Sequence, residues 1–126
     1  MRIAAVLLAL AISAIAWAGT PQSYADAKAI WQQHMNGADY QTYSAEFAQF
    51  NNHFHLDEKD GCYALAPGPV NLMLVISHAG NDEFAVIEQV LSDVDNAKSR
   101  CFKNTYRGIH TKIPPFFPFV LQMGMG

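Results

Sequence analysis

Histidine side chains give this 126-residue chain its clearest potential for metal chemistry, and there are five of them: His34, His53, His55, His78 and His110. His53 and His55 would share a face, and could chelate an ion, if residues 52–56 were extended. On the helix that the surrounding pattern predicts, the same spacing means about 200° of rotation, which points the two rings apart. Two imidazoles without a thiolate or a paired carboxylate would also hold zinc weakly. We therefore expect structural or surface histidines, with no metal and no cofactor.

The sequence contains none of the common hydrolase patterns. It has no Gly-x-Ser-x-Gly elbow, no His-Glu-x-x-His helix and no pair of isolated core carboxylates. Asp57, Glu58 and Asp60 lie together in a polar turn, where we expect solvated carboxylates. The chain is therefore expected not to be an enzyme, and no catalytic residue is named.

The first 18 residues have the pattern of a cleavable secretory signal. Arg2 supplies a positive charge, residues 3–18 carry none, and Ala16-Trp17-Ala18 is the small-x-small pattern that precedes a cleavage site. A helix needs roughly 20 apolar residues to span a bilayer, and this run is shorter. We expect cleavage before Gly19, which leaves no transmembrane anchor; an uncleaved N-terminal anchor is the alternative.

Cys62 and Cys101 form an even cysteine count, and an oxidising compartment favours joining them. We therefore expect one disulfide. Closing a loop of about 40 residues would stabilise the fold by roughly 4 kcal/mol in the loop-entropy model. The alternative is a reactive thiol, but neither cysteine lies in a Cys-x-x-Cys pair or beside a histidine.

Acidic side chains outnumber basic ones, with a net charge of −3. This balance argues against a general nucleic-acid binder, so no nucleic acid is expected as a partner. Most of the bases lie within residues 98–112, where they are interleaved with Cys, Phe and Tyr. We interpret this stretch as a solvated helix face.

Residues 19–126 are expected to form a single domain that begins with a helical pair at 20–56. The first helix is predicted to open at Thr20-Pro21 and to end in a left-handed cap at Asn36-Gly37. The second helix is predicted to be capped by Asp39. It carries an aromatic stripe at alternating steps of three and four, which indicates a core face: Tyr40, Tyr43, Phe47, Phe50 and Phe54.

Residues 62–126 are expected to supply a sheet. From Val70 the apolar period changes to two, which predicts a strand with one face formed by Val70, Leu72, Leu74 and Ile76. Residues 78–82 have hairpin-loop chemistry, because Gly80 and Asn81 tolerate positive φ, and residues 83–91 are predicted to return as the partner strand.

The C-terminal part is predicted to contain a helix and a last strand. Ser92 and Asp95 resemble a capping box for a helix over 93–107, with Val94, Ala97, Cys101 and Thr105 on its inner face. Pro118 confines the start of the last strand, 116–125, to a sheet edge. The fold class is therefore α+β: a small antiparallel sheet made of a two-stranded hairpin, a helix and a third strand, with two additional N-terminal helices, the helices packing on one face.

The order of these segments resembles the C-terminal domain of the TonB/TolA family. The resemblance rests on residues 70–77 (Val-Asn-Leu-Met-Leu-Val-Ile-Ser), the Gly80 turn, the helix opening at Asp95-Asn96-Ala97, and Ile113-Pro114-Pro115 before the last strand. It covers about half of residues 19–126. Cys101 corresponds to a helical cysteine of some TolA-type members, whereas Cys62 lies before the first strand. The anchor and long linker of these families are not expected here, so the resemblance implies a stand-alone exported member.

The resemblance implies a protein–protein interaction module of the periplasm. In this family the last strand is the edge at which a receptor segment pairs, and here that position is occupied by Phe119, Val120, Leu121 and Gln122. A partner segment would add as a further strand, with backbone bonds supplying affinity. The implied partner is an envelope protein, an outer-membrane receptor segment or a second copy of the chain. The edge could instead be covered by an N-terminal helix, as proteins commonly arrange.

A second hypothesis comes from a different functional class. The aromatic stripe and the histidines of the helical pair could make a small periplasmic carrier of a ligand or metal ion. Binding would then depend on His53 and His55.

Overall fold

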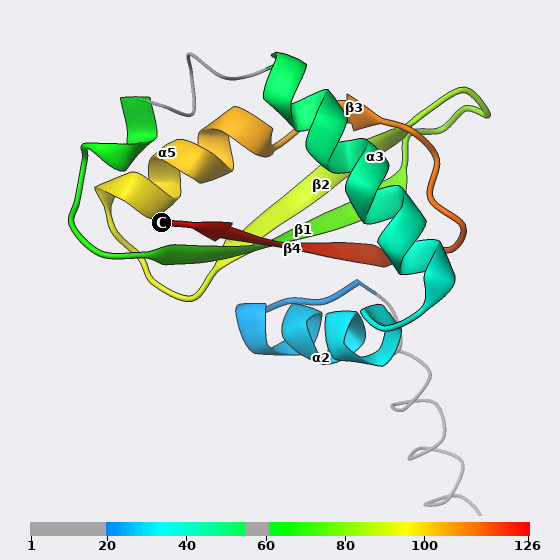
Figure 1. The fold of residues 1–126 in the computed structure, drawn as a ribbon, viewed down its shortest axis with the longest axis horizontal. Coiled ribbons are helices and arrows are strands. Elements are labelled where there is room, and N and C mark those ends of the chain that lie inside the picture. The colour runs from blue at the N-terminus through cyan, green and yellow to red at the C-terminus, as the bar shows by residue number, and fades with distance from the viewer. Residues whose placement is uncertain (1–19, 55–60) are drawn as a thin grey trace, which may run out of the picture.

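The computed structural model describes residues 20–54 and 61–126, which form four strands and three longer helices around one sheet (Figure 1). The strand order is β3-β2-β1-β4, and every neighbouring pair is antiparallel. The α+β class is therefore confirmed. The short strand β3 was not predicted. In chain order the elements are α2 (Tyr24–His34), α3 (Ala38–Phe54), β1 (Val70–His78), β2 (Ala85–Ser92), α5 (Ala97–Tyr106), β3 (His110–Thr111) and β4 (Phe119–Met125).

Helices cover both faces of the sheet, so the prediction of a single helical face is wrong. In Figure 1, α3 and α5 lie on one side of the strands and α2 on the other. The reason lies in β1, because the middle of its second face is apolar too. Met73 and Val75, which alternate with Leu72, Leu74 and Ile76, are 1% and 0% exposed. A central strand that is apolar on both faces requires cover on both.

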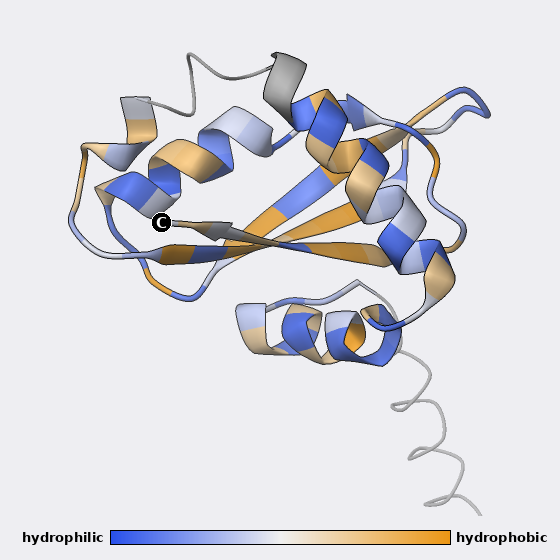
Figure 2. Cartoon of the chain, in the orientation of Figure 1, coloured by the Kyte–Doolittle hydropathy of each residue, from blue (hydrophilic) through white to orange (hydrophobic). Residues whose placement is uncertain are grey.

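The larger core lies between the sheet and the pair α3 and α5. Three aromatic residues of α3, namely Tyr40, Tyr43 and Phe47, are buried there against Phe102 and Tyr106 of α5. The predicted stripe is therefore core over these positions, whereas the side chain of Phe54 lies outside the described residues. Figure 2 shows the matching hydrophobic colour along the central strands.

The smaller core lies on the opposite face, under α2. Ala27 is fully buried, and it packs with Met73, Val75 and Val120 from the two strands above it. A small residue at this position lets the helix approach the sheet closely. Trp31 contacts this cluster as well as the larger one.

The two N-terminal helices begin at other residues than predicted, α2 later and α3 earlier. α2 starts at Tyr24 because the Ser23 hydroxyl accepts the Asp26 N–H at 3.1 Å, so Ser23 and not Thr20 is the N-cap. α3 starts at Ala38, which places Asp39 inside its first turn rather than at the cap. A hydroxyl side chain near a helix start indicates an N-cap, but Thr20 and Ser23 are both such residues. The sequence pattern therefore did not distinguish between them.

The end of α2 also differs from the prediction. Its last residue is His34, and the C-cap Met35 is still right-handed, with φ −60°. Gly37 is not among the described glycines with positive φ. No left-handed cap forms, because the chain turns directly into α3 and Gln41 N–H bonds to Gly37 O at 3.1 Å.

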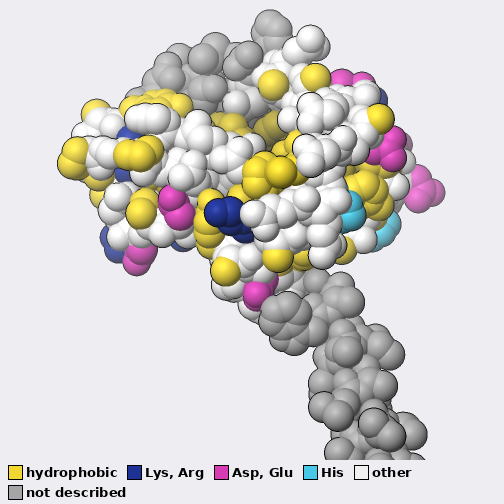
Figure 3. Space-filling view, turned by 60° about the horizontal axis from the view of Figure 1, so that its bottom comes forward, with side chains coloured by type: hydrophobic (Ala, Val, Ile, Leu, Met, Phe, Trp, Pro, Cys, Tyr) yellow, Lys and Arg dark blue, Asp and Glu magenta, His cyan; other side chains and the backbone are white. Residues whose placement is uncertain are grey.

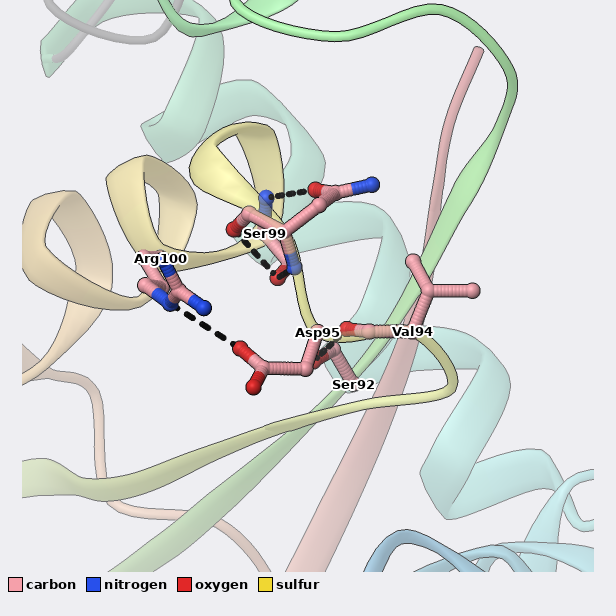
Figure 4. A network of polar contacts seen from close by, with 6 residues as sticks. Ser92, Val94, Asp95, Ser99 and Arg100 are labelled. Carbon is pink, nitrogen blue, oxygen red and sulfur yellow. Dashed lines mark hydrogen bonds and ion pairs between the residues drawn. The ribbon is translucent and has the colours of Figure 1, made fainter.

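Helix α5 is capped by Asn96 and Ser99, and the predicted capping box at Ser92 and Asp95 is wrong. Asn96 Oδ1 accepts the Ser99 N–H at 2.8 Å and Ser99 Oγ accepts the Asn96 N–H at 2.9 Å (Figure 4). Asp93, which was predicted to begin the helix, lies before it and bonds to β1 instead. Its carboxylate accepts two hydrogen bonds from Asn71.

The buried face of α5 also differs from the prediction, because the bulky rings decide which side packs. It consists of Lys98, Ser99, Phe102 and Tyr106, in place of Val94, Ala97, Cys101 and Thr105.

The hairpin and the last strand follow the predicted chemistry with shifted ends. Gly80 has φ +86°, whereas Asn81 keeps a negative φ and its Oδ1 accepts the N–H groups of Glu83 and Phe84. Because these hydrogen bonds hold residues 81–84 in a turn, β2 begins only at Ala85. The last strand begins at Phe119 rather than at residue 116, directly after Pro118.

Cys62 and Cys101 form the predicted disulfide, with a Cα–Cα distance of 5.4 Å. The bond joins the segment before β1 to the middle of α5, across a sequence separation of 39. The bond therefore closes a long loop, and it restricts the conformations that the unfolded chain can adopt.

Removal of this disulfide should lower the free energy of unfolding by about 4 kcal/mol, because the unfolded chain regains the entropy of that loop. Urea denaturation of the Cys62→Ala/Cys101→Ala variant measures the loss. Wild-type protein with a reductant is the matched control, since it keeps both sulfur atoms. A loss below about 1 kcal/mol would contradict the loop-entropy account.

Tyr106 should make the fold sensitive to alkali. Its hydroxyl donates to Asn51 Oδ1 at 2.8 Å, and burial raises the pKa of Tyr106 to about 12. The unfolded chain releases this proton near pH 10, so stability should fall between pH 10 and 12 by up to about 1.4 kcal/mol per pH unit.

Urea denaturation at pH 8, 10 and 11 checks this dependence. Tyr106→Phe should be less stable at pH 8 yet lose less on going to pH 11. A smaller alkaline loss should remain in that variant, because burial also raises the pKa of Tyr43. Identical pH slopes for both proteins would contradict the assignment to Tyr106.

Candidate functional site

The predicted partner-binding residues Phe119, Val120, Leu121 and Gln122 are consecutive in β4, which forms one edge of the sheet. β4 pairs along its whole length with β1, from Phe119 opposite Ile76 to Met125 opposite Val70. Phe119 and Leu121 face the core under α3 and α5, and Val120 faces α2. These three side chains are at most 2% exposed, so the strand can offer a partner its backbone far more than its side chains.

The outward backbone groups of β4 belong to alternate residues. Gln122 sends its N–H away from β1, because this group donates to the Tyr40 hydroxyl at 3.3 Å. In an antiparallel pair every second residue points the same way, so Val120 and Gly124 also face outward. The backbone groups of Phe119 and Leu121 are therefore used within the sheet. Gly124 was missed by the sequence analysis, although the period of two from Gln122 leads to it.

Tyr40 covers the middle of this edge. Its hydroxyl accepts from Gln122 N–H and, at 2.8 Å, from Trp31 Nε1, and its ring stacks on Phe119 with centroids 5.7 Å apart. One oxygen thus connects α2, α3 and β4. The expectation that an N-terminal helix covers the edge is met at Gln122, but no hydrogen bond within the described part engages the backbone of Gly124.

The chain end beyond Gly124 is held in place from inside. Met125 is 3% exposed, and the buried Lys98 donates from Nζ to Gly68 O at 2.6 Å and to Gly126 O at 3.5 Å. A buried ammonium group needs such acceptors. Gly124 itself is exposed, and a Cβ placed there would meet only Asn71 Oδ1, at 3.7 Å. This stretch is therefore an accessible and ordered strand end.

The described histidines lie against aromatic rings. His34 packs on Phe116 with centroids 4.4 Å apart, and His78 packs on Phe117 at 3.8 Å. Within residues 20–54 and 61–126, no three side chains among His, Cys, Asp and Glu could hold a metal ion together. The side chain of His53 and all of His55 lie outside the described residues. Figure 3 shows histidine beside hydrophobic side chains, and charges of both signs scattered over the visible face.

A hollow beside the aromatic stripe is the place where a carrier would hold its ligand. Its volume is about 200 Å³, and its lining includes Tyr43, Phe47 and Lys112. Ligand pockets usually measure about 300 to 1,000 Å³. Tyr43 also closes one side, because its hydroxyl donates to Lys112 O at 2.6 Å. The hollow therefore gives the carrier hypothesis little support.

Comparison of the chain with family models, with curated proteins and with solved structures finds no match. Among the described helices, none is long and apolar enough to cross a membrane. The likeness to the TonB/TolA domain therefore stays a prediction from the sequence, and the candidate site rests on the geometry of β4.

Loss of the Tyr40 hydroxyl should both weaken the fold and open the β4 edge. Tyr40→Phe leaves Trp31 Nε1–H and Gln122 N–H without their acceptor, which should cost about 1–3 kcal/mol of unfolding free energy. Urea denaturation measures this cost, and amide exchange at Gln122 should accelerate. Tyr63→Phe, at a ring that is 37% exposed, is the matched control. Unchanged exchange at Gln122 would show that Tyr40 does not cover the edge.

Proposed function

We propose that this protein is an exported, periplasmic interaction module, not an enzyme, that binds an extended segment of an envelope partner as an added strand on β4. One observation carries the proposal: β4 is an edge strand whose outward backbone groups at Gly124 have no partner within the described part of the chain. Unpaired edge groups are a ready template for pairing with another chain. This use of the last strand is also what the resemblance to the TonB/TolA domain implies.

The strand behind this edge supports such binding. β1 is sandwiched between β4 and β2, and residues 72–76 are at most 1% exposed. An added strand would therefore pair with a β4 edge that is already supported by β1. Binding would cost little entropy for ordering this domain. Because the core-facing side chains of β4 are buried, affinity would come mainly from backbone hydrogen bonds. Selectivity would then depend on neighbouring groups such as Gln122.

Tyr40 limits how far a partner strand can extend. Pairing at Gly124 needs no change in the structure, whereas pairing at Gln122 requires its N–H to exchange the Tyr40 hydroxyl for a partner carbonyl. That exchange would also leave Trp31 Nε1 to find another acceptor. The proposed complex therefore begins at the open C-terminal end of β4 and extends along the strand as Tyr40 withdraws.

The proposed compartment is supported by the signal-like N-terminus and by the disulfide. A cystine bond persists in an oxidising environment such as the periplasm. The partner is an outer-membrane receptor segment or another envelope protein, with a second copy of the chain as the alternative that presents the same edge.

Proline at Gly124 should abolish partner binding while the domain stays folded. It removes an outward N–H without touching the bonds between β4 and β1, as proline at a sheet edge can. Disulfide-intact residues 19–126 serve as bait for an envelope extract. Val120→Pro is less suitable, because Val120 is 2% exposed and packs under α2.

Gly124→Ala is the matched control, since it keeps the N–H and its Cβ has room. A protein captured by wild type and Gly124→Ala, but not by Gly124→Pro, would support strand addition. Sedimentation of the purified domain tests the second-copy alternative. Equal capture by all three forms would remove β4 as the binding edge.

A further inference from the structure

The sheet has a second open edge, on the outer side of β2. β3 pairs with β2 only at Ala85 and Val86. One further pair of bonds follows, in which Ile87 N–H donates to Ile109 O at 2.9 Å and Gly108 N–H donates to Ile87 O at 2.8 Å. Beyond Ile87, no described strand lies beside β2 on this side. The outer edge is therefore open over residues 88–92.

The outward groups of this edge belong to Val90 and Ser92. Gln89 and Leu91 lie opposite Val75 and Met73 of β1, and the next alternate residue, Asp93, donates its N–H to Asn71 O at 3.2 Å. Residues 89, 91 and 93 thus direct their backbone groups to β1, so the residues between them point outward. No hydrogen bond within the described part engages the backbone N–H and C=O of Val90 or Ser92.

A groove of about 420 Å³ runs between this edge and α5, and its lining is basic. Arg100, Lys103 and Arg107 come from one side of the helix, and Glu88 is the acidic residue that lines it. The excess of positive charge stands out in a chain with a net charge of −3. Three of its eight lysines and arginines meet here.

Two of these bases have no acidic partner within the described part. Arg100 Nε bonds to Asp95 Oδ1 at 3.0 Å, as Figure 4 shows. The hydrogen bond and charge of Arg100, together with the charge of Lys103, lower the pKa of the Asp95 carboxyl. Lys103 and Arg107 form no ion pair with a described residue. They are thus available to an anionic ligand, and they lie one helical turn apart.

We propose that this groove binds an extended acidic segment of a partner protein, which adds as a strand to β2 over residues 88–92. The backbone of this acidic segment forms hydrogen bonds with the backbone groups of Val90 and Ser92. Its carboxylates contact Lys103 and Arg107. The spacings agree, because four residues of a helix rise about 6 Å and alternate side chains of a strand lie about 6.6 to 6.8 Å apart. The site is separate from the β4 edge, which lies at the other side of the sheet.

A peptide fits these observations better than a free anion or a nucleic acid. Inorganic phosphate would use the bases but not the backbone groups of β2. A nucleic acid would meet a protein of net negative charge. An acidic strand uses the open edge and the bases together.

The test uses a nine-residue peptide in which aspartate alternates with threonine and valine, titrated into the disulfide-intact chain and followed by amide NMR shifts. The amides of Val90 and Ser92 should shift and become protected from exchange. Lys103→Glu should weaken binding about tenfold or more, and the milder Lys103→Gln should weaken it less. Lys28→Glu makes the same charge change on α2, at an exposed site, and should have little effect beyond that of net charge.

Two N-methylated forms of the peptide separate strand addition from charge attraction. Methyl groups on one alternate set of nitrogens block the bonds to β2 and should abolish binding, whereas methyl groups on the other set should leave it nearly unchanged. Equal effects of both sets, or equal weakening by Lys103→Glu and Lys28→Glu, would overturn the proposal. So would competition by millimolar phosphate at constant ionic strength that fully displaces the peptide.

The Gly124→Pro variant keeps this test independent of the β4 proposal. It leaves β2 and α5 untouched, so it should bind the acidic peptide as the wild type does. Loss of peptide binding in this variant would place the site at β4 and overturn the assignment to β2.

Discussion

Burial of β1 on both of its faces dictates where the helices and the neighbouring strands must lie. Residues 72–76 are at most 1% exposed, so apolar side chains project in both directions from one central strand. At about 25 cal/mol per Å², leaving either face in water would remove much of the stability of so small a domain. α2 must therefore cross one face while α3 and α5 cover the other, and β1 must have a strand on each side.

Buried polar contacts fix how the layers sit on this strand. Tyr40 joins α2, α3 and β4 through one hydroxyl, Tyr106 joins α5 to Asn51 of α3, and Lys98 holds Gly68 and the chain end. Apolar packing alone tolerates sliding of one layer over another, whereas an unpaired buried polar group is costly. These contacts consequently set the register of the helices, and the disulfide adds a covalent connection between α5 and the segment before β1.

A single central strand with one neighbour on each side also produces two edges of different character. The edge at β4 is flanked by apolar packing and is closed at Gln122 by Tyr40, which leaves its C-terminal end accessible. The edge at β2 is open beyond Ile87 because β3 is short, and basic side chains of α5 line it. A backbone-driven contact and a charge-driven contact could therefore coexist on one small sheet.

The sequence alone predicted the α+β class, the β1–β2 hairpin, the aromatic core face of α3 and the Cys62–Cys101 bond, because period, turn residues and cysteine count are local or compositional signals. It did not determine the cap of α5 or the helix on the second face. Several hydroxyl and amide side chains compete for each helix start, and a doubly apolar strand does not name what covers it. The three-dimensional packing places the Tyr40 hydroxyl against the Gln122 N–H, leaves Gly124 open, and brings the bases of α5 beside β2. Each of these contacts joins residues far apart in the chain, and their positions follow from packing on β1.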